Sequence, residues 1–529
     1  MKHLMGIDLG TSSVKVLLME EGGPIAGVAS EEYPILIPRE RYAEQEPETW
    51  WRSTAGAIRR LLARSGVHPS TIAGISFSGQ MHGLVPLDRT GAVVRPAIIW
   101  CDQRSTEEVE EIYRVIGREE VGRITLNPVF TGFMIASLLW TKRHEPESYQ
   151  RIATVMLPKD YLRYRLTGTV GTDVTDASST LAFDTTRRQW ADGLLEALGV
   201  PISIFPSCSL PTEQVGVVSA AAAGDTGLAE GTPVMSGGSD QPMQAIGSGL
   251  TEPGALSITT GTGGQLFSLC ERPLLNPLLN THTFCHVIPG CWYVMAATLS
   301  AGMSLSWFAR AVAREEDLAA LTAEAATVPP GSEGAIFLPY LAGERTPHLD
   351  PEASGLFYGL TLKHTRAHMT RAILEGVAYS YRECLETLLS FGVTVHRIVG
   401  AGGGARIPLW LQIQADVLGQ PIAATTAPEQ ASLGAAITAG IGVGMYTDYR
   451  QACGALIGQE NRVVEPDPSH AEVYQARYGR YRELYARIRG PDRAHGPGES
   501  IPAGGMSHRI PGKVIGADAA PGDAGRSKR

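Results

Sequence analysis

Two aspartates stand where an apolar run gives way to glycine. Asp8 ends the run 4–8, one residue before a Leu-Gly-Thr turn, and Asp240 follows the run 233–236 and two glycines. A buried charge without a partner is costly, so an acid in such a place needs a reason. Asp8 either stabilises the turn or holds, directly or through water, a magnesium ion that accompanies phosphate. Asp240 either caps the helix expected to start there or accepts the proton of an attacking hydroxyl group.

Two short loops rich in glycine and hydroxyl side chains follow apolar strands. Phosphate oxygens need many donors, and glycine lets backbone N–H groups come close to them. Either loop alone is typical of a hairpin turn, but two in equivalent places predict a nucleotide site shared by two halves of the chain. A third glycine cluster, 400–404, follows the apolar run 397–399 and precedes a helix; its alternative is a plain tight turn. The residues of the two loops are Gly10, Thr11, Ser12 and Ser13 in the first, and Gly261, Thr262 and Gly263 in the second.

A Met-His pair, Met81 and His82, lies between glycines just after the predicted strand 72–77. A histidine at the carboxyl end of a strand predicts contact with a small substrate, although a lone histidine is more often a structural hydrogen-bonding group. Trp100 and Arg104 follow in the chain and could border the same substrate. For these two residues, core packing and a surface ion pair are the alternatives.

The elements that must position these residues are strands and helices in alternation, which indicates an α/β fold. The runs 4–8, 14–19 and 25–29 predict a meander of three strands, and an apolar stripe at helical spacing predicts a helix over 48–63. The segment 258–262 repeats the pattern of 7–11, which indicates a second copy of the meander. The segment 292–297 would be the third strand of this second copy. We therefore expect two related domains.

Length and composition agree with two domains, because 529 residues exceed what one core holds. We place the first domain at 1–246, the second at 247–489, and a disordered tail at 490–529, where glycine, proline and charge replace large apolar residues. A net charge of -9 without a basic stripe argues against nucleic acid as a partner. The amino end is not typical of a signal peptide, and no apolar run suits a membrane helix. Seven cysteines without a C-x-x-C pair predict reduced thiols and a cytoplasmic protein.

Several longer segments of the sequence carry further motifs. They are GIDLGTSSVKV, GQMHG, LPKDYLRYRLTG, FLPYLAGERTPH, GLFYGL with HMTRAILEG, and GAGGGAR. Together they resemble the FGGY carbohydrate kinases, and within that family the xylulokinases, from Met5 to about Ile488. The resemblance implies an actin-like ATPase fold, with two ribonuclease-H-like domains around a central cleft. It also implies transfer of a phosphoryl group from Mg-ATP to a sugar, D-xylulose in the xylulokinases, and makes a homodimer plausible.

The resemblance also assigns roles. It implies that Asp8 is the metal-associated aspartate and Asp240 the catalytic base. Met81 and His82 fall in the sugar-contacting segment, and Gln241 follows the base. On the nucleotide side fall three glycines outside the two loops, Gly302, Gly403 and Gly404.

Two departures from the family pattern bear on the sugar. Ser137 stands where the family's first signature has a lysine, and Gln241 stands where many xylulokinases have asparagine. A kinase of glycerol, ribulose, gluconate or a signalling ketose therefore stays an alternative. A more distant alternative is an actin-like ATPase that does not phosphorylate a sugar.

Overall fold

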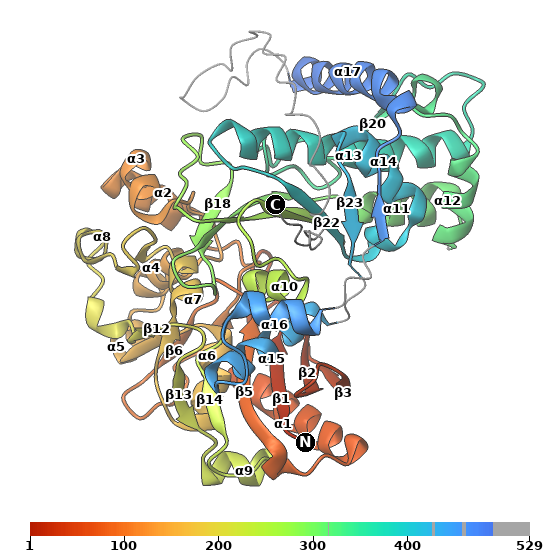
Figure 1. Ribbon diagram of the computed structural model, residues 1–529. Helices are drawn as coiled ribbons and strands as arrows, with labels where there is room; N and C mark the ends of the chain where they lie inside the picture. The colour runs from red at the N-terminus through yellow and green to blue at the C-terminus, as the bar shows by residue number, and fades with distance from the viewer. Residues whose placement is uncertain (316, 426–428, 458–461, 490–529) are drawn as a thin grey trace, which may run out of the picture.

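The computed structural model describes residues 1–315, 317–425, 429–457 and 462–489. The tail predicted at 490–529 lies outside these ranges. Two large sheets form the framework (Figure 1). The strands of the first sheet are β1 (His3–Leu9), β2 (Ser13–Glu20), β3 (Ile25–Glu32), β5 (Ile72–Gly79), β13 (Gln214–Val217), β14 (Pro233–Met235) and β15 (Gly238–Ser239). Those of the second are β16 (Ala255–Thr260), β17 (Gly264–Cys270), β18 (His282–Cys285), β19 (Trp292–Thr298), β22 (Arg397–Ala401), β23 (Ile422–Ala424) and β24 (Arg462–Val464).

The two sheets have the same strand order. The first runs β3-β2-β1-β5-β14-β13 and the second runs β19-β17-β16-β22-β23-β24, with β18 added at the edge. In both, an antiparallel meander of three strands is followed by two parallel strands and an antiparallel edge strand. The predicted α/β fold and the internal repeat are thereby confirmed, including β19 as the third strand of the second copy.

Five two-stranded pairings complete the β-structure. They are β4 (Glu44–Gln45) with β7 (Ala97–Ile98), β6 (Val85–Leu87) with β8 (Thr154–Met156), β9 (Thr172–Asp173) with β12 (Cys208–Ser209), β10 (Phe183–Asp184) with β11 (Gln189–Trp190), and β20 (Ile336–Leu338) with β21 (Leu356–Tyr358).

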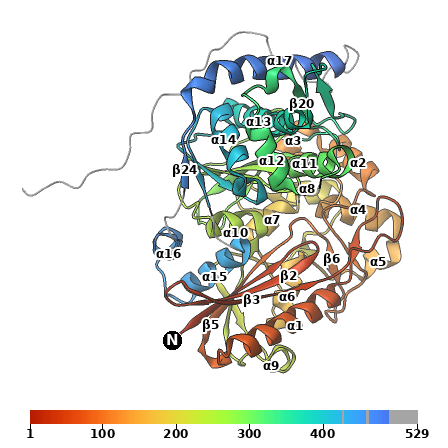
Figure 2. The ribbon, with the colours of Figure 1, turned by 90° about the vertical axis from the view of Figure 1, so that its right-hand side faces the viewer.

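The helices cover the sheets and fill the connections (Figures 1 and 2). In the first half they are α1 (Pro47–Ser65), α2 (Thr106–Ile116), α3 (Arg118–Thr125), α4 (Met134–His144), α5 (Pro146–Arg151), α6 (Pro158–Thr167), α7 (Val174–Ser179), α8 (Asp192–Ala197), α9 (Ala220–Thr226) and α10 (Asp240–Gly247). In the second half they are α11 (Gly302–Phe308), α12 (Leu318–Ala326), α13 (Arg366–Ser390), α14 (Pro408–Leu418), α15 (Gln430–Gly442), α16 (Tyr449–Leu456) and α17 (Ala471–Arg489).

Helix α1 illustrates how the pattern produces the packing. Proline suits the first helical turn, and Pro47 begins the helix, while Gly66 ends it in a left-handed conformation. Its buried face carries Trp50, Ile58 and Leu61 at helical spacing and packs against β2 and β3. The predicted helix over 48–63 is therefore present, two residues longer at its carboxyl end.

The chain returns to the first sheet after it has built the second. Helix α15 packs against β1 and β5 and lies alongside α10, with α16 next to it (Figure 1). Gly247 permits the close approach of α10 and α15, because a Cβ there would lie 1.9 Å from the Gln430 carbonyl oxygen. The range predicted for the second domain thus contains two helices that cover the first sheet, while α13, α14 and α17 pack together beside the second.

No helix within the described ranges combines the length and apolar content that crossing a membrane requires.

Candidate active site

Three parallel strands of the first sheet end side by side and bring the predicted catalytic residues together. In the register of these strands, Asp8 on β1 is level with Ser78 on β5, which is level with Gly238 on β15. Beyond the carboxyl ends of these strands the chain continues into 80–83 and into Asp240. This edge is where open α/β sheets bind ligands.

Asp240 is the first residue of α10, and Ser239 occupies the cap position before it. Its Oδ1 atom is buried and has no hydrogen-bond partner among the described residues. Burial, and then the negative charge of Asp8, raises the pKa of Asp240 from 3.8 to about 7. A carboxyl group with this pKa is suited to accept a proton near neutral pH.

Asp8 lies in a similar environment. Burial raises its pKa, an effect that a hydrogen bond from Ser78 Oγ at 2.7 Å and the charge of Lys15 oppose. Lys15 in turn forms an ion pair of 2.7 Å with Glu429. Two neighbouring carboxylates repel each other, which destabilises the charged form of both. A divalent cation prefers oxygen ligands and reduces this repulsion, so the environment suits such an ion. The carboxylate of Asp8 fits this requirement.

The first glycine-rich loop, 10–13, is held by side chains that reach its carbonyl groups. Tyr33 Oη donates to Gly10 O at 2.6 Å, and Gln45 Nε2 donates to Thr11 O at 2.7 Å. Trp100 Nε1 donates to Thr11 Oγ1 at 2.9 Å. The carbonyl groups of Gly10 and Thr11 are thus occupied by protein donors, and Ser12 is exposed. Trp100, predicted beside the sugar, contacts the first loop.

The second glycine-rich loop, 261–264, and the strand end before it contact Gly302 and the glycine cluster 400–404. Gly302 N donates to Gly261 O at 2.8 Å, and a Cβ on Gly302 would lie 2.4 Å from that oxygen. A Cβ on Gly404 would likewise lie 2.4 Å from Thr260 Cγ2. The structure therefore brings together the predicted nucleotide-side residues Gly261, Thr262, Gly263, Gly302, Gly403 and Gly404, which lie far apart in the sequence.

His82 has a defined protonation state. Its Nδ1 atom lies 2.8 Å from the carbonyl oxygen of Ser179, which can only accept, so Nδ1 carries the hydrogen. Burial lowers the pKa of His82 to about 4, and the ring stacks on Phe133 with centroids 3.9 Å apart. The imidazole is therefore neutral at pH 7, and its Nε2 atom offers a lone pair. The backbone of His82 has φ 71°, a conformation uncommon outside glycine.

Met81 and Gln241 lie next to these groups. Met81 is buried, and Tyr293 Oη of the second sheet donates to its sulfur at 3.6 Å. The neighbouring Gln241 lowers the pKa of the Asp240 carboxyl group, against the larger effect of burial. An apolar cluster that joins Met81 and Phe133 to Phe267, Phe284 and Tyr293 connects the two sheets at this point.

Several residues of the site were not identified from the sequence. Gln45 and Tyr33 support the first loop without any motif of their own. Glu344 accepts from Leu299 N at 3.1 Å, and burial raises its pKa to about 8. The guanidinium group of Arg345 lies 5.6 Å from the ring of Phe130, and its charge helps to lower the pKa of His82. The segment FLPYLAGERTPH contains both residues, but nothing in it indicates what they contact.

Comparison with known proteins agrees with this geometry. The model of the N-terminal domain of the FGGY family of carbohydrate kinases matches residues 3–247, and that of the C-terminal domain matches residues 256–443. This chain belongs to the FGGY family of carbohydrate kinases. It is therefore an enzyme, a sugar kinase, with ATP as its phosphoryl donor.

Relatives in the FGGY family align over nearly their whole length. The xylulose kinase of Bacillus subtilis (strain 168) is 36% identical over 489 residues, which is 92% of this chain and 98% of the relative. The xylulose kinase of Escherichia coli (strain K12) is 35% identical over 485 residues, which is 92% and 99% of the two chains. The crystal structure of xylulose kinase from Rhodospirillum rubrum superposes with a TM-score of 0.86 at 32% identity, covering 92% of this chain and 99% of that one. The expected fold is confirmed.

Proposed function

We propose that this FGGY kinase transfers the γ-phosphoryl group of ATP to D-xylulose, forming D-xylulose 5-phosphate and ADP. The printed names of the relatives support the sugar. The observation that carries the mechanism is the position of Asp240. Its carboxyl group has one buried, unpartnered oxygen and a pKa near 7, and it lies at the same sheet edge as the first loop and the Met-His pair.

In the proposed step, a sugar hydroxyl oxygen attacks the γ-phosphorus of ATP. The new bond joins that oxygen to phosphorus, the bond from phosphorus to the bridging oxygen of ADP breaks, and the hydroxyl proton passes to Asp240. Such transfer depends mainly on positioning and on neutralising charge. The bridging oxygen leaves with the electron pair of the broken bond, so the charges balance.

The sugar would bind against His82 and Met81. The neutral imidazole of His82 accepts a hydrogen bond from a sugar hydroxyl through Nε2, because Nδ1 is committed to Ser179. Met81 is buried beside it and accepts a hydrogen bond from Tyr293 through its sulfur. Gln241 would complete this end of the site.

The phosphates would lie between the two glycine-rich loops. Loop 10–13 contributes hydroxyl groups and N–H donors from the first domain, and loop 261–264 contributes donors from the second. The adenosine would bind beside Gly302, Gly403 and Gly404, which pack closely against Gly261 and Thr260 at the second loop. Both domains are thereby needed to bind ATP, and their closure on the sugar would exclude water.

A magnesium ion would be held by Asp8, directly or through water. When bound, the ion neutralises charge on the ATP phosphates. In Asp8→Ala, we expect activity to need a higher magnesium concentration, with the magnesium titration shifted by about ten-fold or more. The matched control is Ser78→Ala, which removes a hydrogen bond to Asp8 but keeps its carboxylate. An unaltered magnesium titration in Asp8→Ala would contradict this assignment.

The deciding experiment measures ADP release from Mg-ATP by the purified protein across ketopentoses, polyols and sugar acids. Strong stimulation by D-xylulose alone supports the proposal. Stimulation by glycerol, ribulose, gluconate or another ketose instead would move the substrate while leaving the fold and the base unchanged. Of the two departures from the family pattern, Ser137 is buried in α4 and Gln241 follows the proposed base in α10. Equal turnover with and without every sugar would favour an ATPase and contradict the proposal.

A further inference from the structure

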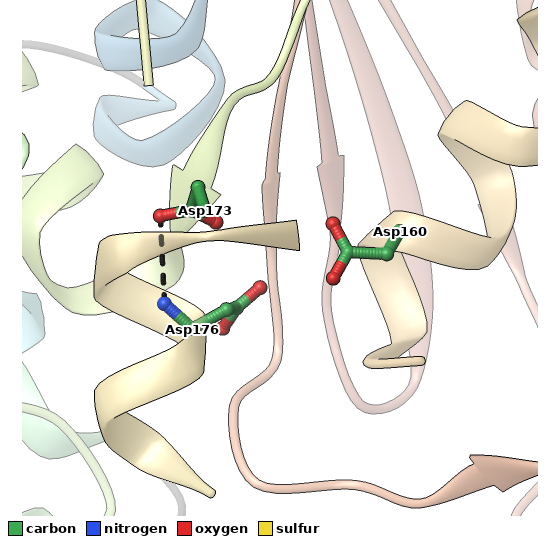
Figure 3. A group of neighbouring side chains, drawn as sticks. All are labelled: Asp160, Asp173 and Asp176. Atoms are coloured by element: carbon green, nitrogen blue, oxygen red, sulfur yellow. Dashed lines mark hydrogen bonds between the residues drawn. The ribbon is translucent and has the colours of Figure 1, made fainter. Parts of the chain in front are cut away.

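A buried cluster of acids lies behind the proposed sugar site. Asp160 on α6 faces Asp173 and Asp176 at the start of α7 (Figure 3), and one oxygen of each lies within 4.8 Å of the others. This spacing could hold a metal ion, but a lysine already occupies it. Lys159 Nζ lies 2.6 Å from Asp160, 2.7 Å from Asp173 and 3.1 Å from Asp176. The cluster is therefore an internal ion-pair network and not a metal site.

The charges of this network balance if one acid keeps its proton. Two cations, Lys159 and Arg163, face the three carboxyl groups, with Arg163 3.4 Å from Asp160. Burial raises the pKa of Asp176 well above its usual value, and the charges of Asp173 and Asp160 add to this effect while that of Lys159 opposes it. With one of the three acids protonated, two carboxylates face two cations. Such a network is costly to break, because removing one partner leaves a buried charge uncompensated.

The amino end of α7 connects this network to the proposed base. Asp173 Oδ1 accepts from Thr175 N at 2.7 Å and from Thr175 Oγ1 at 2.5 Å. Thr175 Oγ1 also accepts from Ser239 N at 2.8 Å. Ser239 is the residue immediately before Asp240. A continuous chain of contacts thus runs from the ammonium group of Lys159 to the backbone that carries the base.

The carboxyl end of the same helix connects to the sugar side. Ser179 O accepts the hydrogen bond from His82 Nδ1 at 2.8 Å, and Ser179 Oγ accepts from His82 N at 3.3 Å. Helix α7 has six residues and is buried along its length. One short rigid element therefore contacts both the strand end before Asp240 and the histidine that would hold the sugar.

We propose that the buried ion pair of Lys159 and Asp173 is a positioning device, which through α7 fixes Asp240 and His82 at a set distance from each other. The inference rests on the proposed roles of Asp240 and His82. It assigns a function to Lys159 of LPKDYLRYRLTG, to Asp173 and to Thr175, none of which would touch the reacting atoms. A phosphoryl transfer in which positioning supplies much of the rate is sensitive to such supports.

The sharpest test is Thr175→Val, which keeps the shape of the side chain and removes the hydroxyl between Asp173 and Ser239. We expect kcat to fall roughly 10- to 100-fold, with the KM for ATP unchanged, because a displacement near 1 Å has an effect of that size. Thr175→Ser restores the hydroxyl and should return kcat to within about three-fold of the wild type. Wild-type kcat in Thr175→Val would overturn the inference.

A matched control separates positioning from stability. Thr226→Val removes a buried hydroxyl from α9, one that donates to Ala222 O at 2.6 Å and accepts from Leu228 N at 3.2 Å. It should lower the thermal midpoint while kcat stays at the wild-type value. An equal loss of kcat in Thr175→Val and Thr226→Val would show a general structural effect and overturn the inference.

Asp173→Asn tests the ion pair itself. Asparagine can still cap α7 but offers Lys159 one acceptor fewer, so both ends of the helix should shift. We expect a lower kcat together with a higher KM for the sugar, whereas Thr175→Val should affect mainly kcat. Unchanged values of both constants in Asp173→Asn would contradict a positioning role.

A substrate-free measurement distinguishes failure of this inference from failure of the proposed function. Hydrogen exchange of the Ser239 amide in the protein without ligands should be faster in Thr175→Val and Asp173→Asn than in the wild type and in Thr226→Val. Exchange that is the same in all four proteins would overturn the inference, whatever the substrate. A wild type without sugar-dependent turnover would instead refute the proposed function and leave the exchange result valid.

Discussion

Replacing Asp240 by asparagine should abolish most activity and yet stabilise the ligand-free protein. Asparagine keeps the shape of the side chain but cannot accept the hydroxyl proton. Loss of a positioned base of this kind lowers kcat by about 10²–10⁴, or roughly 3–5 kcal/mol of transition-state free energy. The nucleotide-side glycines are untouched, so the affinity for ATP should stay at the wild-type value.

The stabilisation follows from the pKa of Asp240. Its value in the folded protein, about 7, lies above the ordinary value of 3.8. As pH rises from about 4, the unfolded chain loses this proton first, so the free energy of unfolding falls until pH passes about 7. At ~1.4 kcal/mol per pH unit over about three units, the carboxylate destabilises the folded protein by up to about 4 kcal/mol at pH 8. Asparagine carries no charge and avoids this loss.

The assay compares urea unfolding of the wild type and Asp240→Asn, without nucleotide or magnesium, at pH 5 and pH 8. The stability advantage of the variant should grow by about 3 kcal/mol between these pH values, because about two pH units of the titration lie between them. The kcat/KM for the sugar in the wild type should rise with pH and level off above about 7. A variant that is less stable than the wild type at pH 8, or that turns over at the wild-type rate, would refute the reasoning.

Three further predictions concern single contacts. His82→Asn should raise the KM for the sugar about ten-fold by loss of one hydrogen bond, with the KM for ATP unchanged. Asparagine suits this position because it tolerates the left-handed backbone. An unchanged KM for the sugar would remove His82 from the site. Gly302→Ala places a Cβ 2.4 Å from Gly261 O, so the KM for ATP should rise while calorimetric sugar binding stays the same. Trp100→Phe loses the 2.9 Å hydrogen bond to Thr11, and kcat/KM for ATP should fall by roughly three- to ten-fold, in line with about 1 kcal/mol for one hydrogen bond. Wild-type ATP kinetics in either of these last two variants would contradict the placement of that loop.

Local chemistry in the sequence was enough to predict much of the fold. Glycine and proline mark the turns of the meander and the ends of α1, and alternating apolar runs mark the strands. The repeat of 7–11 in 258–262 was visible because both copies need a strand that ends in a glycine turn. The return of α15 and α16 to the first sheet was not predicted, because a helical pattern states which face is apolar and not which sheet will cover it.

The candidate site, like the fold, was predicted from the sequence only in part. Phosphate binding and proton transfer require glycine loops, hydroxyl groups and an acid after a strand. These residue types are visible in the sequence, so the candidate site could be proposed from the sequence alone. The sequence alone could not distinguish a helix-capping Asp240 from a base, because its pKa depends on burial and on the charge of Asp8, which only folding brings near. The contact of Trp100 with the first loop likewise depends on the tertiary structure.

The sequence by itself therefore determined the chemistry available to this protein, its two related halves and its membership of a kinase family. Only the tertiary structure decided how that chemistry is tuned. It set the neutral tautomer of His82 through the carbonyl of Ser179, joined Gly302 to Gly261, and placed Lys159 among three acids. The physical reason is that periodicity and turn propensity are local properties, whereas burial, electrostatic coupling and close backbone approach arise between segments that the sequence keeps far apart.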